Sequence, residues 1–354
     1  MKKLSFSFCV LFFSALLALG IASLALPGNT FSELENRTLK TASAVSSDVL
    51  GGRFQSDLED AVSDQFLLRY GCVTLGTEIK HLSGRRDICG AYVCRGRLIR
   101  KVAESDVSYG EISAHAEKYA RAADRAGIPL AAVVVPSASV VLRGELPYGA
   151  EVFDSDRATA LISEAIPDTL DLRTAVAWDT DCFYRTDHHW TARGAYLAYR
   201  AWREYRGETP REIEEFSLET VTGDFYGSLY SKAPLGGIAP DTIEIPEIPD
   251  GVTVTADGKE IGVYDRGALS EKDKYKIFFG GNHGVLTIEN PAAAGKGTLL
   301  VVKDSFANSL VPFLIGDHEK IVMIDERYAT VDIASLATET GAGEIVIIKE
   351  GAFF

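Results

Sequence analysis

The chain has 354 residues, with 36 Lys and Arg against 50 Asp and Glu, so its formal net charge is −14. Hydrophobic residues make up 46% and charged residues 24%, which is typical of a folded protein and excludes a mainly disordered chain. The acidic balance, without any long basic run, excludes nucleic acid as an expected partner. The length allows one large domain or two modest ones.

The first 26 residues differ from the rest of the chain. Lys2 and Lys3 precede an apolar run from Leu4 to Leu26. A positive start followed by an apolar run predicts export. The run is longer than the roughly 7–15 apolar residues of a cleaved signal and close to the roughly 20 that span a bilayer. We therefore expect residues 1–26 to be a single membrane anchor with an extracytoplasmic body. Cleavage at Ser23–Ala25, giving a secreted protein, is the alternative.

The cysteines agree with an exported body without requiring one. Cys9 lies in the apolar run, which leaves Cys72, Cys89, Cys94 and Cys182 in the body. Four cysteines in an oxidising compartment form up to two bridges with three possible connectivities, whereas free buried thiols are the alternative. The sequence contains no Cys-x-x-Cys pair, so a zinc knuckle or a thioredoxin-type redox site is unsupported.

Three stretches organise the first part of the body. Residues 27–53 are rich in Ser, Thr, Gly and Asn and are expected to form a linker. From Phe54 to about His81, apolar residues recur at helical spacing. From Ile88 to Arg100 the pattern predicts a hairpin with its turn at Arg95 and Gly96. These stretches precede the region in which strands and helices alternate.

The alternation begins with a helix expected from Tyr109 to Ala126, ended by Gly127, a residue that tolerates positive φ. Leu130–Val135 is a continuous apolar, β-branched run, which is typical of a strand buried on both faces of a parallel sheet. Further along, strands are expected at Thr298–Val302, Lys320–Ile324 and Glu344–Ile348, and helices at Thr191–Arg206, Phe306–Ile315 and Asp332–Thr340.

Strands that alternate with helices predict an α/β fold with a mostly parallel sheet flanked by helices. Between about residues 216 and 291 the sequence changes to Gly, Pro and short β-like pieces. We interpret this region as a β-rich insertion, so that residues 54–354 form one domain after the linker.

Asp187-His188-His189-Trp190 is the first candidate site, because two of the six histidines of the chain are adjacent here beside an aspartate. An aspartate that accepts from one imidazole nitrogen fixes the tautomer and leaves the other nitrogen to act as a base. In an extended segment, residues two apart point the same way. We therefore expect Asp187 and His189 to face one cavity and His188 to point elsewhere.

Ser305 is the second candidate. It follows the expected strand at Thr298–Val302 and precedes a helix, which places it at the carboxyl edge of the sheet, where open α/β folds have their sites. The helix N-terminus offers N–H groups for a developing oxyanion. Ser305, His189 and Asp187 would then form a set of nucleophile, base and orienting acid.

Both motifs are also compatible with roles other than catalysis. The Asp and His residues are also compatible with a metal site or a hydrogen-bonded turn, although no further group with ligand spacing appears and no metal or cofactor is expected. Ser305 is compatible with a simple helix cap. Four more residues are candidates for oxyanion or substrate binding: Asn282, His188, Tyr226 and Ser228.

Several segments, taken in order, resemble the DHHW family, which is named for the tetrapeptide at 187–190. They are residues 32–37, 64–69, 186–195, 225–230, 280–284, 303–308 and 325–328. The family is similar to the SGNH-hydrolase-like enzymes that O-acetylate alginate and other exported polysaccharides. The resemblance implies an SGNH-hydrolase-like fold and the roles of orienting acid for Asp187, base for His189 and nucleophile for Ser305. Because the usual SGNH order has Ser first, it implies a circularly permuted arrangement.

The function expected from this resemblance is an extracytoplasmic O-acetyltransferase that modifies a cell-surface or exported polysaccharide. A membrane-bound O-acyltransferase is implied as the partner that supplies acyl groups. A carbohydrate acetylesterase of the same fold and a non-catalytic envelope protein that binds or assembles glycans are the alternatives. The acidic body favours a neutral glycan or a locally basic cleft.

Overall fold

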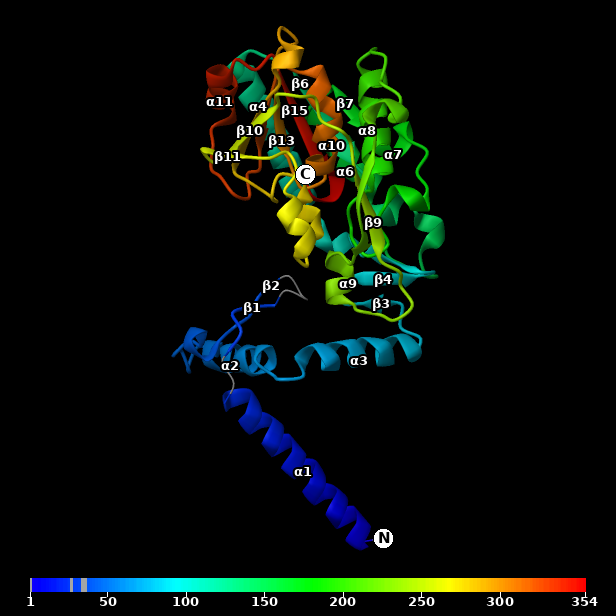
Figure 1. Ribbon diagram of the computed structural model, residues 1–354, viewed down its shortest axis with the longest axis vertical. Coiled ribbons are helices and arrows are strands. Elements are labelled where there is room, and N and C mark those ends of the chain that lie inside the picture. Colours follow the sequence, from blue (N-terminus) through cyan, green and yellow to red (C-terminus); the bar gives the residue numbers. More distant parts are fainter. Residues whose placement is uncertain (1, 26–27, 33–36) are drawn as a thin grey trace. The chain divides into compact units, whose positions relative to one another are not determined.

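The computed structural model describes residues 2–25, 28–32 and 37–354. The chain forms two compact units (Figure 1). The smaller unit comprises Met1–Gly84 with Ser231–Gly236, and the larger comprises Arg85–Tyr230 with Gly237–Phe354.

The smaller unit is mainly helical. Its elements are α1 (Lys2–Ala25), β1 (Phe31–Ser32), β2 (Arg37–Thr38), α2 (Arg53–Asp64) and α3 (Arg69–Leu82). The window Phe6–Ser23 of α1 is long and apolar enough to cross a membrane, and none of the residues that the structure describes bury it. This helix is compatible with a signal anchor or a signal peptide. The helical stretch expected from Phe54 onward is divided into α2 and α3 by a break at residues 65–68.

The larger unit is built on an eight-stranded sheet with the order β11-β10-β12-β14-β13-β15-β6-β7. The strands from β14 to β7 pair in parallel, whereas β11, β10 and β12 extend the sheet in antiparallel pairs. The prediction of a mostly parallel sheet is confirmed. The strands are β6 (Leu130–Val135), β7 (Thr169–Asp171), β10 (Thr253–Ala256), β11 (Lys259–Ile261), β12 (Val285–Glu289), β13 (Thr298–Lys303), β14 (Lys320–Ile324) and β15 (Glu344–Glu350).

Helices cover both faces of this sheet. One face packs against α7 (Leu172–Ala175), α8 (Ala192–Tyr205) and α10 (Ala307–Leu314), and the other against α4 (Tyr109–Ala126), α6 (Ser155–Ala165) and α11 (Ile333–Thr340). Alternate residues of β6 belong to the two separate cores, with Val133 on one side and Val134 on the other. Burial on both faces explains why this strand is a continuous apolar run in the sequence.

The remaining elements are short. The hairpin of β4 (Ala91–Cys94) and β5 (Arg97–Arg100), joined by β3 (Asp87–Ile88), confirms the one expected before α4. A separate ribbon pairs β8 (Glu219–Phe225) with β9 (Asp241–Ile245). Short helices are α5 (Ala138–Val141) and α9 (Ser228–Lys232).

Several local predictions are confirmed in detail. Helix α4 ends at Gly127, whose φ is 68°, and Thr191 caps α8 by accepting a hydrogen bond from the Gly194 N–H. For the cysteines the sequence left disulfide bridges and free buried thiols open, and in the described chain they form no disulfide bond. Cys182 is fully buried, whereas Cys72 and Cys89 are exposed.

Candidate active site

Ser305 lies in the turn between β13 and α10, at the carboxyl end of a strand flanked on both sides by parallel neighbours. The turn is held by Asp304, whose two carboxylate oxygens accept from the Phe306 N–H (2.9 Å) and the Glu350 N–H (2.7 Å). Burial raises the pKa of Asp304, and the two hydrogen bonds oppose this rise by stabilising the ionised carboxylate. The turn that carries the serine is therefore held by the carboxylate of the neighbouring Asp304.

The loop that carries Asp187 and His189 is closed at its base. Tyr184 N–H donates to the His189 carbonyl (3.1 Å), and Phe183 forms an isolated bridge with Trp190. Its start is tied to the buried Asp241, whose carboxylate accepts from the backbone N–H groups of Arg185 (2.8 Å) and Thr186 (2.9 Å). The two histidines consequently lie on a short constrained loop instead of an extended strand.

The structure brings Asp187, His189 and Ser305 into one hydrogen-bonded chain. His189 Nε2 lies 2.7 Å from Ser305 Oγ, and His189 Nδ1 lies 2.6 Å from Asp187 Oδ1. Asp187 and His189 are 4% and 5% exposed, so water competes little for these contacts. This geometry would allow Ser305 to act as a nucleophile, His189 as its base and Asp187 as the acid that orients the base.

Asp187 is held on both oxygens. Its Oδ1 also accepts from the His189 N–H (3.0 Å), and its Oδ2 accepts from the Ser228 N–H (2.7 Å). Burial alone would raise its pKa, but the neighbouring His188 and His189 and these hydrogen bonds hold the pKa well below the usual range. Gly227 packs so closely that a Cβ there would lie 2.4 Å from Asp187 Cβ.

Tyr275 supports the base from one side. Its ring stacks on the His189 imidazole, with centroids 4.0 Å apart and planes 7° from parallel. Its hydroxyl donates to the Ser305 carbonyl (3.2 Å) and contacts Ser309 Oγ (3.0 Å). One side chain thus contacts both segments of the site. Tyr275 is not predictable from the sequence as a site residue, because a single tyrosine 30 residues before Ser305 forms no local pattern.

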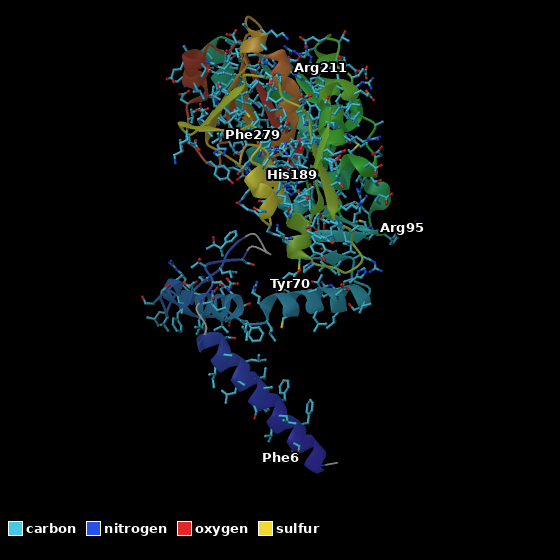
Figure 2. The ribbon with its side chains drawn as sticks, viewed as in Figure 1. Phe6, Tyr70, Arg95, His189, Arg211 and Phe279 are labelled. Carbon is cyan, nitrogen blue, oxygen red and sulfur yellow. The ribbon has the colours of Figure 1, made fainter. Side chains whose placement is uncertain are left out.

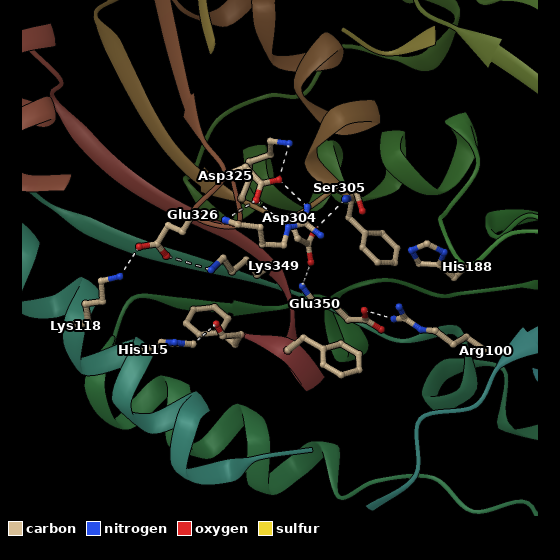
Figure 3. Close-up of a pocket in the computed structure, with 15 residues that line it drawn as sticks. Arg100, His115, Lys118, His188, Asp304, Ser305, Asp325, Glu326, Lys349 and Glu350 are labelled. Atoms are coloured by element: carbon tan, nitrogen blue, oxygen red, sulfur yellow. Dashed lines mark hydrogen bonds and ion pairs between the residues drawn. The ribbon is translucent and has the colours of Figure 1, made fainter. Parts of the chain in front are cut away.

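A cavity of about 590 Å³ opens over Ser305 (Figure 3). Its exposed charge is mainly positive, because Lys118 and Arg327 are 51% and 52% exposed at their side chains while their carboxylate partners are sheltered. Lining residues are Arg100, His115, Lys118, His188, Lys303, Asp304, Ser305, Phe306, Asp325, Glu326, Arg327, Lys349, Glu350, Phe353 and Phe354. The cleft is locally basic in an acidic protein.

The four other candidate residues divide into two groups. His188 lines the cavity, and its Nδ1 lies 3.0 Å from Ser228 Oγ. The expectation that His188 points away from His189 is wrong: the rings lie 3.9 Å apart, because the loop is not extended. Ser228, Tyr226 and Asn282 are not among the residues that line this cavity. The Tyr226 ring packs 4.5 Å from that of Tyr230.

Asn282 joins a buried polar network behind Ser305. Its Oδ1 accepts from Lys303 Nζ (3.1 Å) and Asn308 Nδ2 (3.0 Å), and Lys303 also contacts Asp325 (3.3 Å). Because an ammonium only donates, the Asn282 atom that faces it must be oxygen. Burial lowers the pKa of Lys303 to about 8.

Asp187, His188 and His189 also offer ligand atoms within 4.8 Å of one another, a spacing at which a metal ion could bind. Both ring nitrogens of His189, however, already contact Asp187 and Ser305. A metal bound at His189 would have to displace one of these two contacts. The geometry therefore favours the hydrogen-bonded triad over a metal centre.

The DHHW protein family model matches residues 176–324, a region that contains both candidate segments. No curated protein matches the chain closely enough to count as a relative. A DHHW family protein from Eubacterium siraeum is similar in structure, with 22% identity, a TM-score of 0.62, and coverage of 74% of this chain and 91% of that one. PatB1 from Bacillus cereus, solved with a sulfonyl adduct, has 17% identity, a TM-score of 0.62, and coverage of 74% and 94%.

At these identities the solved structures establish the fold. Both share with this chain the α/β fold with a mostly parallel sheet that the sequence predicts. The family match confirms the resemblance to the DHHW family over residues 176–324, the part of the chain that the family model covers.

Proposed function

We propose that this protein is an extracytoplasmic serine O-acyltransferase that moves an acyl group, in the first instance acetyl, onto a hydroxyl of a polysaccharide. The observation that carries the proposal is the chain of contacts from Ser305 Oγ through His189 to Asp187, at 2.7 Å and 2.6 Å. The family resemblance supports acyl transfer to an exported polysaccharide. The sulfonyl adduct of PatB1 adds support, since such an adduct is a covalent modification of the protein.

In the first half of the reaction, His189 Nε2 takes the proton of Ser305 Oγ while the oxygen attacks the carbonyl carbon of the donor. The bond from that carbon to the donor's leaving oxygen or sulfur then breaks, and His189 returns the proton to the leaving atom. Asp187 stays ionised throughout because its pKa is held low, and it stabilises the imidazolium. An acyl ester on Ser305 results.

In the second half, a hydroxyl of the acceptor gives its proton to His189 and attacks the acyl ester. The bond to Ser305 Oγ breaks, and the proton moves from His189 to Ser305. Water in place of the polysaccharide hydroxyl gives hydrolysis, which is the esterase alternative. Exclusion of water and fit of the acceptor decide between the two outcomes.

The tetrahedral oxyanion requires N–H donors close to Ser305. The backbone N–H of Ser305 donates to no group in the described part of the chain, which leaves it free for this role. That Asn282 donates the second hydrogen bond to the oxyanion remains a prediction. Its Oδ1 is engaged by Lys303 and Asn308, so its Nδ2 would have to supply the hydrogen bond.

The test is acetyl release from p-nitrophenyl acetate by the full-length chain in detergent. We expect Ser305→Ala to lower the rate by at least about 10³-fold, while Ser335→Ala, an exposed serine on α11, leaves it unchanged. Equal rates in wild type and Ser305→Ala would support the non-catalytic alternative. A chelator should leave the rate unchanged, whereas a metal-dependent site would lose activity.

Addition of an oligosaccharide separates transferase from esterase. A mass gain of one acetyl group on the oligosaccharide means transfer, and free acetate alone means hydrolysis. The exposed Lys118 and Arg327 of the cleft allow anionic as well as neutral acceptors, so both should be tried. The proposed acyl donor is a membrane-bound O-acyltransferase, and its pairing with this chain is tested by co-purification from membranes.

A further inference from the structure

Helix α3 exposes an apolar stripe that no described residue covers. Leu68, Leu75, Ile79 and Leu82 are 54%, 61%, 57% and 81% exposed, and Cys72 is exposed as well. Their spacing of four, three, four and three residues places them on one helical face. We call these five residues the α3 stripe.

The opposite side of the helix shows the reverse pattern. Thr77, which points away from the stripe, is 2% exposed, and Thr77 Oγ1 donates to the Val73 carbonyl (2.9 Å). A helix of a water-soluble protein normally buries its apolar face and exposes its polar one. An exposed apolar surface of this extent marks an interaction site.

Hydrogen bonds connect α3 to the end of the apolar helix α1. The Leu67 N–H, just before α3, donates to Ser23 Oγ (3.1 Å), and Ser23 is the last residue of the membrane-spanning window. Gln65 exchanges two hydrogen bonds with the backbone of Asn29, at 2.8 Å and 2.9 Å. The start of α3 is therefore placed where the apolar span ends, which in a bilayer is the interface with water.

The length and the charged residues of α3 exclude that this helix itself crosses a bilayer. It has 14 residues, fewer than the roughly 20 that a span requires, and it carries Arg69, Glu78 and Lys80. Its exposed apolar surface continues toward α2, where Val62 is 59% exposed and lines a cavity of about 320 Å³ with Phe66 and Val73. A short helix with one apolar side at this level is suited to lie in the interface plane.

We propose that α3 is an interfacial helix whose stripe inserts into the outer surface of the bilayer that α1 enters. The occupant of the stripe is lipid. The attraction is hydrophobic rather than electrostatic, because the charges of α3 nearly balance and α2 carries Asp57, Glu59, Asp60 and Asp64 against Arg53. Insertion should therefore require neither anionic lipid nor low salt.

The test uses the full-length chain in phosphatidylcholine nanodiscs. Cys9, Cys72, Cys89 and Cys94 are replaced by Ser, and the buried Cys182 remains unlabelled. Single spin labels are then placed on the stripe, at Leu75→Cys or Ile79→Cys. The matched controls are Tyr70→Cys and Lys80→Cys, which are exposed positions on other sides of the same helix.

Stripe labels should show a ratio of oxygen to nickel-chelate accessibility about threefold higher than control labels, at low and at high salt. Equal ratios at all four positions would overturn the proposal. Stripe labels that are shielded from both reagents would overturn it as well, and spin–spin broadening would then identify a second copy as the occupant.

A label-free measurement covers the case in which cysteine variants fail to fold. A lipid-soluble photoreactive carbene reagent in wild-type nanodiscs should modify Leu75 and Ile79 and spare Lys80. Modification of Lys80 to the same extent, or no modification of α3, contradicts the proposal. None of these readouts depends on catalysis, so the proposed function and this inference stand or fall separately.

Discussion

The two segments that meet at the candidate active site are fixed in different ways. The turn with Ser305 extends from β13, which lies between two parallel strands, and it is backed by the buried Lys303 and Asp325. The loop with Asp187 and His189 has no such sheet and depends on a few side-chain and backbone contacts, among them those of Asp241 and Gly227. Changes in the loop should therefore reduce the rate, whereas changes behind the turn should reduce stability.

The largest effect is expected from Asp187→Asn. The amide keeps the size of the side chain but no longer holds the required His189 tautomer, so the rate of p-nitrophenyl acetate hydrolysis should fall by about 10⁴-fold. Thermal unfolding should change little in comparison. A variant with near wild-type activity would remove Asp187 from the proposed mechanism.

Gly227→Ala tests the close packing of the loop. The new Cβ would approach Asp187 Cβ to 2.4 Å, so the carboxylate must move, and a displacement of about 1 Å costs roughly 100-fold in rate. The control is Gly223→Ala, where the nearest atom to a new Cβ is 4.0 Å away. Equal rates in the two variants would show that the loop is not positioned through Gly227.

Tyr275 contacts both segments, so two substitutions separate its contributions. Tyr275→Leu loses the ring stacked on His189 and should reduce the rate by about tenfold. Tyr275→Phe keeps the ring and loses only the hydroxyl contacts to Ser305 and Ser309, so its rate should fall less. If Phe is as damaging as Leu, the hydroxyl and not the stacking supports the base.

Lys303→Met tests how the buried residues behind the Ser305 turn contribute to the free energy of unfolding. Because burial lowers the pKa of Lys303 from 10.5 to about 8, the folded protein binds fewer protons than the unfolded chain between these pH values. The contribution of Lys303 to the free energy of unfolding therefore rises with pH in this window, by up to about 3 kcal/mol.

The measurement compares wild type and Lys303→Met by denaturant unfolding in detergent at pH 7.5 and pH 10. The difference in unfolding free energy, wild type minus variant, should be more positive at pH 10. A difference that is independent of pH would mean that the pKa of Lys303 is close to its usual value in the folded protein.

Much of the fold is predictable from the sequence because its signals are local. The apolar run of β6 and the glycine that ends α4 report burial and backbone conformation directly. The residues that support the candidate site are not predictable in this way. Asp241, Tyr275 and Lys303 act through contacts with residues far away in the sequence, and nothing in their own neighbourhoods reveals those contacts. The direction expected for the His188 side chain is wrong for the same reason, because hydrogen bonds from Arg185 and Thr186 to the distant Asp241 constrain the loop.

Covalent trapping of Ser305 tests the central claim most directly. The full-length chain is treated with a limiting amount of a sulfonyl fluoride, and the modified peptide is mapped by mass spectrometry in wild type and in His189→Ala. The account predicts a single adduct on Ser305 in wild type and a much slower reaction in His189→Ala. An active wild-type protein whose Ser305 stays unmodified, or equal modification of both proteins, would contradict it.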